Sequence, residues 1–171
     1  MKSIVEIVLP SPAREAVWQV GKRIPPEHLD TNGIEDNPHV TVKFGVKDDV
    51  EALMWAVDEQ HTFPVVLGKT HVFTASKGGG YPVVAEAHAA NLQVLHQLVD
   101  SAVGNRKDDF AYSPHVTIAF VKPEFAQQYE GLDWAEGISF SCGSLVLSSA
   151  SGARHGIPFG TKIEPEEMQG R

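Results

Sequence analysis

Two stretches of nearly the same sequence set the strongest limit on the fold of this chain. PHVTVKFGV begins at Pro38, and PHVTIAFVK begins at Pro114 in the second half of the chain. Both runs are rich in β-branched and aromatic residues, which is typical of strands. A predicted strand precedes each motif at a similar distance, from Val5 to His39 in the first copy and from Val84 to His115 in the second. We infer an internal duplication, in which two copies of one unit are related by an approximate two-fold axis.

Each copy is predicted to run as strand, helix, motif strand, helix and strand. Strands are expected over residues 3–10, 38–46, 63–75, 81–89, 114–122 and 137–149, and helices over residues 11–21, 48–57, 88–103 and 123–130. Residues 24–37 contain two prolines and an Asn-Gly pair, which indicates a loop. The prediction is a single α+β domain over residues 1–171, with lobes at about 1–78 and 79–150 and a solvated tail at 160–171. Antiparallel sheets are expected to form a central groove, with the helices outside.

Composition and charge limit the class of protein. Hydrophobic residues make up 42% and charged residues 21%, which is typical of a globular chain. Cys142 is the single cysteine, the N-terminal apolar run is too short for a secretory signal, and 18 consecutive apolar residues occur nowhere, so we expect a cytoplasmic protein without membrane spans. A formal net charge of −8 argues against an extended nucleic-acid surface but allows a small or end-bound phosphate ligand.

Alternation along a strand gives each motif two different faces. His39, Thr41 and Lys43 are expected to project from one side of the first motif strand, and His115 and Thr117 from one side of the second. The intervening apolar residues are expected to face the helices. Two imidazoles and two hydroxyls would then meet on the floor of a groove shared by both halves.

This set of side chains suits the cleavage of a phosphodiester. Histidine titrates near pH 6.5, so one imidazole can accept the proton of an attacking hydroxyl or water while a second, protonated one donates a proton to the leaving oxygen. Threonine hydroxyls can donate hydrogen bonds to the non-bridging phosphoryl oxygens, on which charge builds. The chemistry requires no metal ion.

The chain resembles the two-histidine (2H) phosphoesterase superfamily, whose mark is a pair of His-hydrophobic-Thr/Ser-hydrophobic motifs on matching strands of a duplicated α+β fold. Both motifs are complete here, at 39–42 and 115–118. The resemblance implies that His39 and His115 are the general base and general acid, in unassigned order, and that Thr41 and Thr117 bind the phosphate. It also implies a ribonucleotide substrate: a 2′,3′-cyclic or 2′,5′-linked phosphodiester, or a cyclic mono-, di- or oligonucleotide such as the alarm signals that phage enzymes of this superfamily destroy.

Further residues are candidates for substrate binding. Lys43 has Ala119 as its counterpart in the second motif, and a lysine there can neutralise phosphate charge. Arg154 and His155 lie on a predicted loop over residues 151–156 that can close over a phosphate, and Tyr112 can stack on a base.

Two patterns that resemble ligand sites have simpler interpretations. The stretch SKGGG at 76–80 lies between two predicted strands and lacks the G-x-x-x-x-G-K-[ST] pattern, so a hairpin turn is favoured over a phosphate loop. The histidines show none of the usual zinc-ligand spacings. We therefore expect no metal and no cofactor.

Two alternatives to a metal-independent phosphodiesterase stay open at this stage. A non-catalytic RNA- or nucleotide-binding module can keep the same fold and hydrogen-bond donors, and a metal-dependent hydrolase is a more distant possibility. The short, acidic chain favours a nucleotide or a short or terminal RNA phosphodiester over structured RNA, and a monomer is expected.

Overall fold

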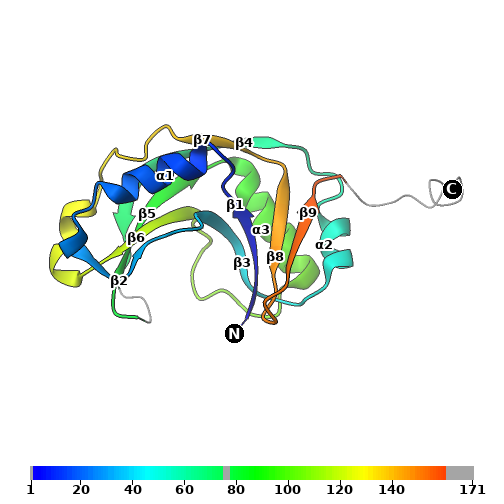
Figure 1. The fold of residues 1–171 in the computed structure, drawn as a ribbon. Helices are drawn as coiled ribbons and strands as arrows, with labels where there is room; N and C mark the ends of the chain where they lie inside the picture. Colours follow the sequence, from blue (N-terminus) through cyan, green and yellow to red (C-terminus); the bar gives the residue numbers. More distant parts are fainter. Residues whose placement is uncertain (1, 75–77, 161–171) are drawn as a thin grey trace, which may run out of the picture.

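The computed structural model describes residues 2–74 and 78–160 and confirms an α+β fold (Figure 1). Its strands are β1 (Ser3–Val8), β2 (Leu29–Ile34), β3 (His39–Val46), β4 (Phe63–Val72), β5 (Tyr81–His88), β6 (His115–Val121), β7 (Ser139–Cys142), β8 (Ser144–Ser148) and β9 (Arg154–Pro158). They pair antiparallel in the order β7-β4-β5-β6-β3-β1-β8-β9, and β2 also pairs with β6. The predicted connector at 76–80 lies partly outside the described residues, and the predicted tail at 160–171 lies almost wholly outside them.

The helices cover one face of this sheet. They are α1 (Ala13–Lys22), α2 (Val50–Ala56) and α3 (Ala90–Val103), together with the 3₁₀ segments η1 (Pro26–His28) and η2 (Pro123–Tyr129). α1 contacts β6 and β2, whereas α3 contacts β3 and α2. Each of the two long helices places a row of apolar residues at helical spacing in the core, as Leu92, Leu95 and Val99 show in α3. In the described part of the chain, no helix has the length and apolar character needed to cross a membrane.

The duplication is visible in matching backbone contacts. Val40 of β3 lies opposite Val116 of β6, so the two motif strands are antiparallel neighbours at the centre of the sheet. At the end of the opening strand of each half, a backbone N–H donates to the proline before the motif: Leu9 to the Pro38 oxygen at 3.1 Å, and Ala87 to the Pro114 oxygen at the same distance. The last strand of each half also pairs with the opening strand of the other half: β4 pairs with β5, and β8 pairs with β1.

A single residue, Gly143, connects strands that lie at the two ends of the sheet. The prediction of one strand over 137–149 is wrong, because Gly143 divides the segment into β7 and β8. β7 pairs with β4 at one end of the sheet, whereas β8 pairs with β1 near the other end. One residue spans about 3.6 Å at most, so these ends lie close together and the sheet is curled (Figure 1).

The predicted loop over 24–37 contains regular secondary structure, although its prolines and Asn-Gly pair indicated a loop. It holds η1 and β2, and β2 pairs with β6 at Leu29 opposite Val121 and at Ile34 opposite Ala119. Its sequence, LDTNGI, is polar and includes Gly33 at φ 66°. β2 forms because β3 meets β6 only near Val40, which leaves the rest of that edge of β6 available for pairing.

A β-bulge interrupts each motif strand directly after the threonine. Glu6 lies opposite Thr41, but the preceding residue Val5 lies opposite Lys43, so Val42 has no partner in β1. The same shift occurs between β5 and β6, where Ile118 is the extra residue. A bulge reverses the alternation of side chains beyond it.

The prediction that Lys43 shares the face of His39 is wrong because of this bulge. Lys43 is only 2% exposed and lies on the helix-covered side, where its Nζ is 3.1 Å from Asp100 Oδ1 of α3 and 2.7 Å from Asp108 Oδ1. A nitrogen paired in this way on the covered side is not available to a ligand on the other face. Ala119, its counterpart, is also fully buried.

Because Lys43 is buried and its two aspartate partners are not, removal of the lysine and removal of the aspartates should change the free energy of unfolding by different amounts. Lys43→Met removes the buried charge and leaves two aspartates that are 48% and 36% exposed and can be hydrated, so the free energy of unfolding should change by less than about 1 kcal/mol. Asp100→Asn with Asp108→Asn leaves the ammonium buried without a carboxylate and should cost about 3 kcal/mol.

Urea denaturation measures both variants. Asp109→Asn serves as the control, because Asp109 is 68% exposed and pairs with Arg106 on the surface, and it should have little effect. Equal losses for Lys43→Met and the double variant would contradict this account of the ion pair.

Candidate active site

The two motif histidines lie on either side of the Val40–Val116 contact. Both valines are fully buried, whereas the flanking His39, Thr41, His115 and Thr117 are partly exposed on the opposite side of the sheet, which we call the open face. With a strand spacing of about 4.8 Å and a rise of about 3.4 Å per residue, the Cα atoms of the two histidines lie roughly 8 Å apart. The structure therefore brings all four predicted motif residues together.

Both imidazoles are oriented by the same kind of contact. His39 Nδ1 lies 2.8 Å from the Asn37 carbonyl oxygen, and His115 Nδ1 lies 2.8 Å from the Ser113 carbonyl oxygen. A carbonyl oxygen can only accept, so Nδ1 carries the proton in each neutral ring. The Nε2 atom of each ring is then the nitrogen that can exchange a proton with a ligand.

A buried carboxylate distinguishes the surroundings of His39. Glu6 of β1 has a side chain that is 7% exposed, with one oxygen 3.4 Å from His39 Nε2 and the other 3.2 Å from the Arg154 guanidinium. In the second half, register places Val84 opposite Thr117, where the first half has Glu6 opposite Thr41. The carboxylate places a negative charge beside His39 and has no equivalent in the duplicated unit.

His115 lies in more apolar surroundings. The ring of Phe73 meets its imidazole edge-on, with ring centroids 4.8 Å apart. Burial lowers the pKa of His115 below the ordinary histidine value, and the nearby charge of a protonated His39 lowers it further. The two imidazoles thus lie in different surroundings, one beside a carboxylate and the other beside an aromatic ring.

Side chains on the helix side support the first motif strand. The Tyr112 hydroxyl donates to the Thr41 carbonyl oxygen at 2.9 Å, and its ring stacks on His96, with centroids 4.2 Å apart. His96 Nδ1 in turn lies 2.7 Å from the Val42 carbonyl oxygen. These contacts satisfy carbonyl groups beside the bulge, and burial raises the pKa of Tyr112. A contact between Tyr112 and substrate stays a prediction.

The predicted loop over 151–156 ends in a strand, and this separates its two candidate residues. Arg154 begins β9 and reaches Glu6 on the open face, where a contact with substrate stays a prediction. The next residue, His155, lies opposite the fully buried Leu147 in the register of β8 and β9 and points to the other side of the sheet. There its charge contributes, after hydrogen bonds from Ser149 and Ser3, to the lowered pKa of Asp48. The prediction that His155 closes over a phosphate from this loop is wrong.

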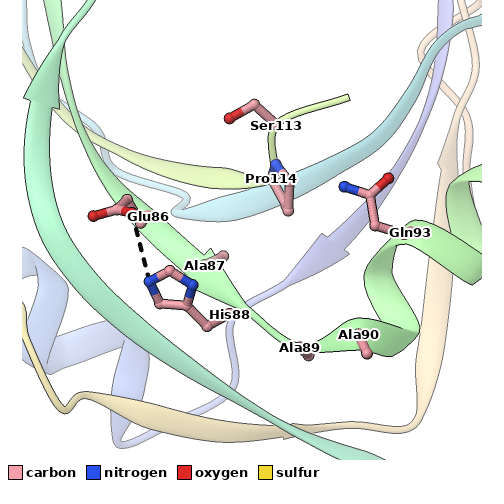
Figure 2. A pocket seen from close by; sticks show the side chains of 8 residues that line it. All are labelled: Glu86, Ala87, His88, Ala89, Ala90, Gln93, Ser113 and Pro114. Carbon is pink, nitrogen blue, oxygen red and sulfur yellow. Dashed lines mark ion pairs between the residues drawn. The ribbon is translucent and has the colours of Figure 1, made fainter. Parts of the chain in front are cut away.

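A cavity of about 570 Å³ adjoins His115 at the end of β5 and β6 (Figure 2). It is lined by Glu86, Ala87, His88, Ala89, Ala90, Gln93, Ser113 and Pro114. Glu86 lies opposite His115 in register, and Ser113 supplies the carbonyl that holds the His115 ring. The cavity is therefore next to the histidine pair.

Several residues of this site were missed by sequence reasoning. Glu6 had a signal, because it is the one charged residue in the otherwise apolar run SIVEIV. Phe73, Glu86 and Gln93 had none, since each reaches the site through strand register or through the packing of α3. Among the described residues, no group of three or more His, Cys, Asp or Glu side chains is placed to hold a metal ion.

Comparison with known protein families identifies the class of this protein. The family model of the 2'-5' RNA ligase superfamily matches residues 37–154, a range that includes both motifs and covers more than half of the chain. The chain belongs to this family of 2H phosphoesterases, which confirms the resemblance seen in the motifs. Its function is accordingly the processing of a phosphodiester.

Solved structures agree in fold. TT0787 of Thermus thermophilus has a TM-score of 0.66 at 17% identity, over 95% of this chain and 100% of that chain. E. coli LigT complexed with 3'-AMP has a TM-score of 0.59 at 21% identity, over 92% and 94% of the two chains. Kluyveromyces marxianus Usb1 has a TM-score of 0.60 at 13% identity, over 92% and 97%. No curated protein matches the chain. At these identities the structural similarity shows the fold alone.

The surroundings of His115 predict its titration. Because burial and a neighbouring positive charge both disfavour the imidazolium, the NMR signals of His115 should titrate with a midpoint below about 6.5. Assignment by comparison with His115→Gln identifies the signals. A midpoint above 6.5 would contradict the environment described for this ring.

Proposed function

We propose that this protein is a metal-independent phosphodiesterase that cleaves a phosphodiester of a small or terminal ribonucleotide by paired histidine acid–base catalysis. The observation that carries the proposal is the pair of imidazoles on neighbouring strands, each with Nδ1 fixed by a carbonyl, which makes Nε2 the nitrogen that exchanges a proton. Membership of the 2H phosphoesterase family supports it. So does the similarity in fold to E. coli LigT, which was solved in complex with 3'-AMP, a ribonucleotide that carries a terminal phosphate.

Within this proposal, the different surroundings of the two histidines favour one division of the catalytic roles. His115, biased towards the neutral form, takes the proton of a water molecule or a 2′-hydroxyl as that oxygen attacks phosphorus. His39, beside Glu6, donates its Nε2 proton to the leaving oxygen as the phosphorus–oxygen bond breaks. Thr41 and Thr117 donate hydrogen bonds to the non-bridging oxygens.

Both the net charge of the protein and its membership of the 2H phosphoesterase family limit the substrate class. The chain carries a formal charge of −8, and Glu6 and Glu86 both lie close to the histidine pair. These features disfavour a long polyanion and favour a single phosphodiester. A 2′,3′-cyclic phosphate, a 2′,5′ linkage and a cyclic mono-, di- or oligonucleotide each present such a group, and the cyclic nucleotides are the smallest test substrates.

Replacement of either histidine tests the reaction. His39→Ala and His115→Ala should each lower kcat against 2′,3′-cyclic or 2′,5′-linked substrates by about 10²–10⁴-fold, since each removes one proton-transfer group. Turnover by the unaltered protein should persist in excess chelator. Full nucleotide affinity in both variants without measurable turnover by the unaltered protein would instead indicate a binding module, and loss of turnover with chelator would indicate a metal-dependent hydrolase.

The assigned roles predict the shape of the pH profile. The acid limb of kcat/KM reports protonation of His115 and should lie below about pH 6.5. Glu6 lies 3.4 Å from His39 Nε2 and is not among the groups that shift the pKa of His115, so Glu6→Gln should leave the acid limb in place. Glu15→Gln, on the exposed surface of α1, is the control and should move neither limb. A shift of the acid limb alone in Glu6→Gln would reverse the two assignments.

A further inference from the structure

The cavity beside His115 has chemistry that the proposed acid–base reaction does not use. Figure 2 shows Glu86 and His88 on one wall, Gln93 of α3 on the opposite wall, and Ser113 with Pro114 above them. Its volume of about 570 Å³ is within the range of small-molecule sites. Because it adjoins the ring that would contact phosphorus, the sugar and base attached to that phosphorus lie within its reach.

Glu86 gives the cavity a carboxylate, a strong hydrogen-bond acceptor, on one wall. On the opposite wall the Gln93 nitrogen donates one N–H to the Tyr112 carbonyl oxygen at 3.1 Å, which leaves its second N–H and its amide oxygen. The small side chains of Ala89 and Ala90 leave space for a flat ring. The Glu86 carboxylate complements a ligand edge that is rich in N–H groups.

Two histidines lie next to the Glu86 carboxylate. Its two carboxylate oxygens lie 3.2 Å from His71 Nε2 and 3.6 Å from His88 Nε2. His71 is also held by Glu130 at 2.6 Å, and the hydrogen bonds to Glu130 and Glu86 raise the pKa of His71. Each carboxylate oxygen has a second lone pair that can still accept from a ligand. A carboxylate also disfavours a second phosphate, so the cavity suits the uncharged part of a nucleotide.

The first half of the duplicated fold lacks these groups. Register places Val8 opposite His39, where the second half has Glu86 opposite His115, and the matching N–H contacts of Leu9 and Ala87 extend this correspondence. Two residues after Val8 the first half has Pro10, where the second half has His88. The polar wall is therefore an addition to one half rather than a consequence of the shared fold.

We propose that this cavity binds the base of the ribonucleotide substrate and prefers guanine over uracil. The inference rests on the proposed function, since it places the substrate phosphate beside His115. Guanine presents adjacent N1–H and N2–H groups that can donate to both oxygens of one carboxylate. Uracil presents one N–H between two carbonyl oxygens, which a carboxylate repels. The cavity thereby gives the substrate a fixed orientation, with the base on the His115 side and Arg154 on the His39 side.

Measurements of binding and of turnover together test the proposed base site. Calorimetry with 3′-GMP and 3′-UMP should give at least about tenfold tighter binding of 3′-GMP, and kcat/KM for the corresponding 2′,3′-cyclic nucleotides should show the same preference. Glu86→Gln should reduce both ratios to near one. Glu130→Gln is the matched control, because it also removes one carboxylate from His71 but does not line the cavity, and it should keep the preference.

The outcomes separate this inference from the proposed function. Equal affinity for the two nucleotides, or an unchanged ratio in Glu86→Gln, overturns the base site even if both cyclic nucleotides are cleaved. A preference that depends on Glu86 without any turnover supports the base site and overturns the catalytic proposal. No binding of either nucleotide overturns both. If Glu86→Gln does not fold, Gln93→Leu removes the amide on the opposite wall and should also reduce the ratio.

Discussion

The antiparallel contact of β3 with β6 at Val40 and Val116 is the interaction on which the rest of this structure depends. Both valines are fully buried on the helix-covered side, and the pleat turns their neighbours to the open face. One cross-strand contact therefore brings two histidines and two threonines from distant parts of the chain into one site. The strands then diverge, and the backbone groups that they leave unpaired are satisfied differently on the two sides: β2 pairs with β6, whereas Tyr112 and His96 bind the carbonyl oxygens of β3.

The two halves of the fold share the same backbone contacts, but the side chains around their two histidines differ. The two Nδ1 contacts are identical at 2.8 Å, yet one ring lies beside the Glu6 carboxylate and the other beside Phe73. A reaction that removes one proton and adds another needs two groups with opposite preferences. Duplication alone supplies two equivalent imidazoles, so the difference has to come from residues outside the motifs. Glu6 in place of Val84, and Glu86 in place of Val8, are the differences that make the two halves unequal.

The sequence is sufficient to predict the class of fold and the four motif residues, because both depend on local alternation and on a repeat that can be read directly. It is insufficient wherever one extra residue changes the outcome. The bulge at Val42 moves Lys43 to the covered side, and Gly143 splits one predicted strand between two ends of the sheet. β2 is stabilised by a vacant sheet edge rather than by its own polar sequence. The cavity beside His115 joins β5, α3 and the segment before β6, so only their packing reveals it.

The central claim is that both imidazoles act on one phosphorus atom. A crystal structure with orthovanadate, which mimics the pentacovalent transition state, tests it most directly. We predict one bound oxyanion within hydrogen-bond distance of Nε2 of His39 and Nε2 of His115, with the hydroxyls of Thr41 and Thr117 also in contact. Vanadate bound to only one of the two histidines, or bound away from the open face, would contradict the account.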